Sequence, residues 1–149
     1  MKIIKRIIIV FVVMFICFKV ISYCFYPEIE IRNFVNHNYI ELEEIAYDYL
    51  VNKISVKEYK GVEIEGIFKG DTDIVQFYYS GFGIAPASTY YGFYYSPNDI
   101  VVMHCNSQDT ACKLVNTKDN EYEWSCDESD NGGRILKIRD YWYYYEAWY

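Results

Sequence analysis

The first 26 residues contain no acidic residue, and their only charges are basic: Lys2, Lys5, Arg6 and Lys19. Within them, residues 7 to 26 form the run IIIVFVVMFICFKVISYCFY, in which Lys19 is the single charge. About twenty apolar residues span a bilayer as a helix. No helical phase of the run offers a polar face, which argues against a surface helix of a soluble protein. The run therefore predicts a membrane-spanning helix.

The charges on either side of this run predict its orientation. Basic residues precede it, whereas Glu28 and Glu30 follow it. By the positive-inside rule, the N-terminus lies in the cytoplasm and residues 28–149 lie in the periplasm or outside the cell of a bacterium. We therefore expect a membrane anchor or uncleaved signal over residues 1–27 and one exported domain over residues 28–149. A cleaved signal peptide with residues 7–18 as its apolar region is the alternative, and it exports the same domain.

Histidine is scarce, and recognisable catalytic motifs are missing. The two histidines are His37 and His104, and the sequence contains no nucleophile elbow, phosphate-binding loop or zinc-protease motif. Cys105 follows His104 directly, so on a strand their side chains would point to opposite faces. The loop at residues 127–133, DESDNGG, has the spacing of half a calcium loop, but Ile138 stands where a bidentate Glu is needed. We expect no catalytic residue, metal or cofactor.

Apolar residues recur at three- and four-residue steps over residues 28–53, which predicts a helix. Asn38 followed by Glu41 resembles a capping box, so a second helix could start there after a break at residues 36–38. The apolar positions are Ile31, Phe34, Val35, Leu42, Ile45, Ala46, Tyr49 and Leu50.

Beyond residue 61, apolar residues recur at every second position, and turn residues separate the segments that show this alternation. This pattern predicts an α+β fold, in which one helical segment packs on an antiparallel β-meander of about six to eight strands. The expected strands are residues 62–68, 74–84, 89–96, 100–105, 111–116, 121–126 and 134–149.

Tyrosine is abundant, with 18 copies against 9 Phe and 3 Trp. Residues 77–96, FYYSGFGIAPASTYYGFYYS, predict a hairpin of two strands rich in rings. Each doublet on it should place one ring on each face of the sheet, one against the helix and the other toward solvent or a partner. Tyr and Trp are favoured at protein interfaces. The doublets are Tyr78 with Tyr79, Tyr90 with Tyr91, and Tyr94 with Tyr95.

Three cysteines lie in the part predicted to be exported, where oxidation is expected. Because Cys112 shares strand parity with Leu114, and Cys126 with Trp124, all three thiols should converge if those faces are inward. We expect one disulfide. Cys105 with Cys112, which flank a six-residue loop, is the favoured pair, and Cys112 with Cys126 is the alternative.

The charge balance of the exported part points to a class of partner. It keeps 10 of the 14 basic residues against all 21 acidic ones, a net charge of −11. Such a surface disfavours nucleic acid, whose phosphates need clustered Lys and Arg. A basic protein suits it better.

These observations lead to one functional hypothesis and two rivals. We expect a non-enzymatic, membrane-anchored protein-binding domain, such as an immunity or inhibitor protein against a basic toxin or enzyme. It would bind through the outward rings of the doublets and the carboxylates of Glu63 and Glu65. The alternatives are an accessory subunit of a cell-envelope complex and a small hydrolase that uses a carboxylate pair, Glu63 with Glu65 or Glu121 with Glu123.

Overall fold

The structure is a computed structural model that describes residues 6, 8–15, 27–69, 73–84, 87–104, 111–127 and 129–149, with the side chains of residues 65–69 excepted. Residues 8–15 are helical and exposed. Within these ranges, no helix combines the length and the apolar character that crossing a membrane requires. The predicted span over residues 7–26 therefore finds no support here, and residues 7 and 16–26 of it lie outside the described residues.

The predicted helical segment is confirmed as helix α2 (Pro27–Tyr47), continued by the short π-helix η1 (Asp48–Asn52). Proline at the first position suits a helix start, because its missing N–H has no partner there. The predicted break at residues 36–38 is wrong, since α2 runs through it. Asn38 makes no cap and instead donates its side-chain amide to the carbonyl oxygen of Phe34, 2.7 Å away.

In the part of the chain that the structure describes, eight strands form one antiparallel sheet in the order β1-β2-β3-β4-β8-β7-β6-β5. The α+β prediction is thus confirmed, but the single meander is corrected. Two four-stranded meanders run in opposite directions and join where β4 pairs with β8. The strands are β1 (Glu58–Tyr59), β2 (Val62–Lys69), β3 (Asp73–Ile84), β4 (Ala87–Tyr95), β5 (Cys112–Lys118), β6 (Glu121–Cys126), β7 (Gly132–Arg139) and β8 (Trp142–Trp148).

Two of the predicted strands differ from the structure. Residues 100–103 are apolar, but residues 100–104 form an irregular segment packed on the sheet rather than a strand. Residues 134–149 are two strands rather than one, because the chain turns at Asp140 and Tyr141, and Tyr141 has a positive φ of 68°.

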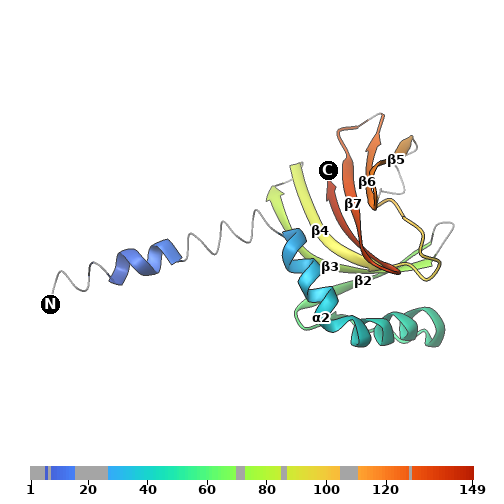
Figure 1. The fold of residues 1–149 in the computed structure, drawn as a ribbon, viewed down its shortest axis with the longest axis horizontal. Helices are drawn as coiled ribbons and strands as arrows, with labels where there is room; N and C mark the ends of the chain where they lie inside the picture. The colour runs from blue at the N-terminus through green and yellow to red at the C-terminus, as the bar shows by residue number, and fades with distance from the viewer. Residues whose placement is uncertain are drawn as a thin grey trace.

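Each face of the sheet carries a buried core. Figure 1 shows a strongly curved sheet with α2 across one side. The helix-face core contains Ile31, Val35, Leu42, Ala46, Val75, Phe77, Phe93, Leu136, Trp142 and Tyr144. The opposite face carries a second core of Ile74, Tyr94, Trp124, Cys126, Ile135, Tyr143, Tyr145 and Ala147, covered in part by Val101, Val102 and Met103. The face expected to be open to solvent or a partner is therefore largely enclosed.

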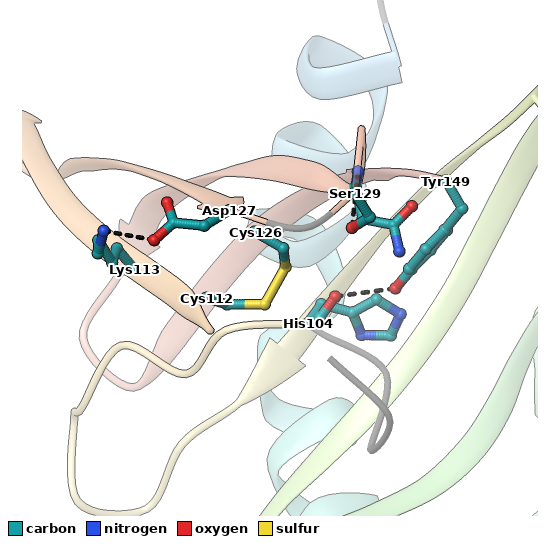
Figure 2. The surroundings of a disulfide bond; sticks show 8 residues. His104, Cys112, Lys113, Cys126, Asp127, Ser129 and Tyr149 are labelled. Atoms are coloured by element: carbon teal, nitrogen blue, oxygen red, sulfur yellow. Dashed lines mark hydrogen bonds and ion pairs between the residues drawn. A yellow bond between two sulfur atoms is a disulfide. The ribbon is translucent and has the colours of Figure 1, made fainter. Parts of the chain in front are cut away.

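The disulfide joins Cys112 to Cys126, so the favoured pair with Cys105 is corrected to the alternative. The reason is the hairpin of β5 and β6, whose register sets Cys112 directly opposite Cys126. Figure 2 shows the bond with the ion pair of Lys113 and Asp127 beside it, at 2.6 Å. Cys105 lies outside the described residues.

We predict that reducing this disulfide lowers the free energy of unfolding by about 2–3 kcal/mol, because the cross-link constrains the unfolded chain. Urea denaturation with and without reductant measures the difference. Mass spectrometry of the alkylated, unreduced protein should find a linked peptide containing Cys112 and Cys126. Cys105→Ser is the matched control and should change neither result. A linked peptide containing Cys105 would contradict the assignment.

Candidate protein-binding surfaces

The three tyrosine doublets divide between the two faces of the sheet. Tyr79, Tyr91 and Tyr95 are half-buried against the helix-face core. Tyr94 belongs to the second core, on the face opposite α2. Alternation along the strands therefore sends most of these rings into packed interiors rather than outward.

The six tyrosines of the doublets differ sharply in how much of the side chain is exposed. Tyr94 is 1% exposed, and its hydroxyl oxygen accepts a hydrogen bond from the backbone N–H of Val102 at 3.0 Å. Burial raises the pKa of Tyr94 far above its ordinary value. Tyr90 is 38% exposed and lies within ring-contact distance of the half-buried Tyr78, at 6.1 Å. Tyr90 and Tyr78 are therefore the two rings of this set that a partner could reach on the face opposite α2.

One of the two predicted carboxylates, that of Glu63, lies on the strand next to Tyr78. Glu63 is exposed on β2, opposite Glu58 of β1 on one side and Tyr78 of β3 on the other. Like charges directly opposite each other on a sheet repel. We call Glu58, Glu63, Tyr78 and Tyr90 the tyrosine edge. Glu65 is also on β2, but its side chain is outside the described part of the chain.

A second exposed surface lies on the outer side of α2 and η1, and the sequence analysis missed it. Ile40 is 64% exposed, and Tyr47 and Val51 are exposed to a similar degree. Glu43 and Glu44 are exposed on the same helix. We call these five residues the helix surface. Ile40, Glu44 and Tyr47 follow one another at steps of four and three, which places them on one stripe. This spacing in the sequence could have indicated a second, exposed stripe, because the buried stripe of α2 uses other positions.

A partly buried charge network fixes α2 on the sheet. Glu28, in the first turn of α2, pairs with Arg134 of β7 and, at 3.1 Å, with Arg32. The Nε atom of Arg134 also lies 3.3 Å from a carboxylate oxygen of Glu121. Burial raises the pKa of Glu146 on β8, although Arg134 and a hydrogen bond from Tyr144 act in the opposite direction. A carboxyl group with a raised pKa keeps its proton to a higher pH and can donate it, which is a property that acid–base chemistry uses.

Asp99 attaches the segment after β4 to the hairpin of β7 and β8. Its carboxylate accepts hydrogen bonds from Lys137 at 2.5 Å, from the Tyr141 backbone N–H at 2.9 Å and from the Tyr143 hydroxyl at 2.9 Å. Burial alone would raise the pKa of Asp99, but these hydrogen bonds outweigh it and hold the pKa below its ordinary value. The segment is thereby fixed over the second core.

His104 closes this segment and is held by aromatic contacts. Its ring stacks on Tyr145 at 4.6 Å, and its carbonyl oxygen accepts a hydrogen bond from the Tyr149 hydroxyl at 2.8 Å. Figure 2 shows His104 and Tyr149, joined by this hydrogen bond, in the surroundings of the disulfide. Burial lowers the pKa of His104 to about 4, so the imidazole is neutral at physiological pH.

Chemical signatures and comparisons add no further constraint on the function. Among the described residues, no three His, Cys, Asp or Glu side chains gather as metal ligands would. Compared with known proteins, the chain matches no protein-family model, no curated protein and no solved structure.

We predict that acidification destabilises the fold through His104. Its folded pKa of about 4 lies below the ordinary 6.5, so between these values the unfolded chain binds the proton and the folded chain does not. The contribution is fully present above pH 6.5 and is lost as the pH falls to 4, on the order of 3 kcal/mol.

Urea denaturation across this pH interval measures the slope. His104→Phe keeps a ring on Tyr145 without a titrating group and should flatten it. Val115→Ala, at an exposed position of β5 and without a titrating group, is the control and should leave the slope unchanged. An unchanged slope in His104→Phe would show that other groups cause the pH dependence.

Proposed function

We propose that this chain is a membrane-anchored, exported and non-enzymatic binding protein whose partner is a basic protein. The apolar run over residues 7–26 anchors it, and the domain that follows acts outside the cytoplasm. An immunity or inhibitor role fits best, because a small acidic domain on one anchor can intercept a basic toxin or enzyme at the membrane.

The observation that carries the proposal is the helix surface, where exposed apolar side chains and carboxylates share one face. Isolated apolar residues on a surface are ordinary, but Ile40, Tyr47 and Val51 follow one another along one helix. Glu43 and Glu44 flank them, and no Lys or Arg falls between Arg32 and Lys53. An apolar centre with an acidic rim is the arrangement that a basic partner with an apolar patch would complement.

The tyrosine edge supports the same partner class through a second surface. Glu58 and Glu63 repel each other in the free protein. A Lys or Arg from a partner would relieve this repulsion, while Tyr78 and Tyr90 lie close enough to pack on its aliphatic stem. The rings of this edge are less exposed than the apolar side chains of the helix surface. We therefore assign the main contact to the helix surface.

The alternative functions rest on other features. A hydrolase would use the cluster around Arg134, because Glu146 has a raised pKa there and Glu121 lies within ion-pair distance of the same guanidinium. An accessory subunit of an envelope complex would use the same surfaces as the binding protein, but with a permanent partner. Turnover of a substrate without any partner protein would favour the hydrolase.

We predict that the full chain is an integral membrane protein with its C-terminal domain outside the cytoplasm. In a bacterial host, alkaline phosphatase fused after Tyr149 should be active, because this reporter folds only after export. The chain should also stay with the membrane in alkaline carbonate. Activity of a cytoplasm-only reporter at the same position would overturn the orientation, and extraction by carbonate would overturn the anchor.

We predict that the two parts of the helix surface affect different steps of binding. After a basic partner is captured from the cell envelope and purified, Glu43→Gln with Glu44→Gln should slow association and weaken its salt dependence. Tyr47→Ala should mainly speed dissociation and weaken the free energy of binding by about 2 kcal/mol, the loss expected for a hot-spot tyrosine. Surface plasmon resonance with the full chain in nanodiscs separates the two rates.

Two matched variants control this experiment. Val115→Ala, at an exposed position of β5, should change neither rate. Glu58→Gln with Glu63→Gln removes charge from the tyrosine edge, and a larger effect there than at the helix surface would move the main contact to that edge. Capture of only neutral or acidic ligands would contradict the binding of a basic protein.

A further inference from the structure

Large exposed apolar side chains gather at one end of the sheet. Phe82 is 73% exposed and Ile84 is 88% exposed, both on β3 next to the turn into β4. Trp148, at the end of β8, is 39% exposed. We call these three residues the apolar tip. None of them belongs to either core cluster or to the surfaces proposed to bind a protein.

The strand register places the three side chains on the same face. Phe82 pairs with Thr89 of β4, which pairs in turn with Trp148 of β8, so Phe82 and Trp148 lie in one row across the sheet. Ile84 is two residues after Phe82 on β3 and therefore shares its face. By alternation along β8, Trp148 shares a face with Trp142, a member of the helix-face core. Two strand spacings separate Phe82 from Trp148, about 10 Å. The apolar tip thus lies on the α2 side of the sheet.

The apolar tip also lies beyond the N-terminal end of α2. Glu28 of α2 contacts Arg134, and Tyr39 packs under the guanidinium of Arg139, so α2 runs along β7 from residue 134 toward residue 139. Trp148 pairs with Gly132, which is two residues before Arg134 on β7. Trp148 therefore lies past the first turn of α2, in the direction away from Arg139. In the view of Figure 1, the free end of the hairpin of β3 and β4 and the start of α2 lie toward the same side of the domain.

Distances along the strands show how far the hairpin extends. Glu146 pairs with Arg134 on one side and with Tyr91 on the other, and Tyr91 pairs with Ser80. Ile84 is four residues further along β3 than Ser80, about 13 Å toward the free end of the hairpin. Pro27 directly follows the apolar run of residues 7–26, so this end of the domain is the one nearest to a bilayer that holds the run.

The chemistry of the hairpin fits lipid better than a charged protein. Residues 77–96 contain no charged residue, although the exported part carries a net charge of −11. Phe, Ile and Trp are the residue types that enter the boundary between headgroups and acyl chains, and Trp is enriched at that depth. A basic partner would find no carboxylate in this stretch, whereas the helix surface and the tyrosine edge both offer carboxylates.

We propose that the apolar tip inserts into the outer boundary of the membrane that anchors the chain, and so holds the domain against the bilayer at a fixed orientation. This inference rests on the proposed anchor over residues 7–26. The contact is apolar, so it needs no anionic lipid and is insensitive to salt. One tip of this size would bind membranes weakly by itself, but the anchor supplies a high local concentration.

Site-specific photocrosslinking of the full chain tests this proposal. The photoreactive residue benzoyl-phenylalanine replaces Phe82 in one sample and, as the control, Tyr141 in another. Tyr141 is an exposed tyrosine at the opposite end of β8, at the turn from β7. Both proteins are reconstituted in phosphatidylcholine vesicles, with and without phosphatidylglycerol, and the lipid adducts are quantified by mass spectrometry.

We expect Phe82 to give about tenfold more lipid adduct than Tyr141, equally in both vesicle types and at high salt. Equal adduct yields at the two positions would overturn the proposal, as would adducts of Phe82 with a second copy of the chain. A yield that requires phosphatidylglycerol or disappears at high salt would overturn the apolar mechanism.

Carbonate extraction of the same vesicles separates failure of the tip from failure of the anchor. If the chain resists carbonate but Phe82 labels no more lipid than Tyr141, the tip proposal is wrong and the anchor stands. If carbonate releases the chain, both are wrong. Phe82→Ser with Ile84→Ser should leave the thermal unfolding midpoint unchanged, because both side chains are exposed, and should make a fluorophore on the domain tumble faster relative to the vesicle.

Discussion

One constraint governs this structure: a single sheet has two faces, and strands rich in apolar residues on both sides must have both faces covered. Alternation makes Trp142 and Tyr144 point to one side of β8 and Tyr143 and Tyr145 to the other. Helix α2 covers the first side. The second is closed by the curvature of the sheet and by the segment at residues 100–104. The hydrogen bonds of Asp99 and the stacking of His104 on Tyr145 hold that second cover in place.

The same constraint explains what could be predicted from the sequence. The burial of Ile31, Val35 and Leu42 follows directly from their helical spacing, and the strands follow from alternation and turn residues. The order of the strands does not, because nothing local in β8 indicates that it pairs with β4 as well as β7. Residues 100–104 have the composition of a strand, and only their packing on the sheet distinguishes them from one.

The candidate surfaces were harder to predict for a related physical reason. Tyrosine has a polar tip, so its abundance suggested outward rings, yet the hydroxyl of Tyr94 is satisfied inside the fold by the backbone of Val102. The carboxylate of Glu63 was predicted next to accessible rings, and it does pair across the strands with Tyr78. The helix surface was missed because its apolar residues alternate with those of the core stripe. A pattern search that looks for burial does not detect a second, exposed stripe.

The pairing of β4 with β8 has a consequence for how the chain can fold during its synthesis. β8 follows every other strand in the chain, yet it forms the junction between the two meanders and gives Trp142 and Tyr144 to one core and Tyr143 and Tyr145 to the other. Neither core can therefore be completed while β8 is still inside the ribosome or a translocation channel. The first meander and α2 would be exposed for that time with an unpaired edge at β4, where another chain could add a strand. If the domain is exported as proposed, this order of strands would keep the chain unfolded until β8 has emerged, which suits passage through a translocation channel.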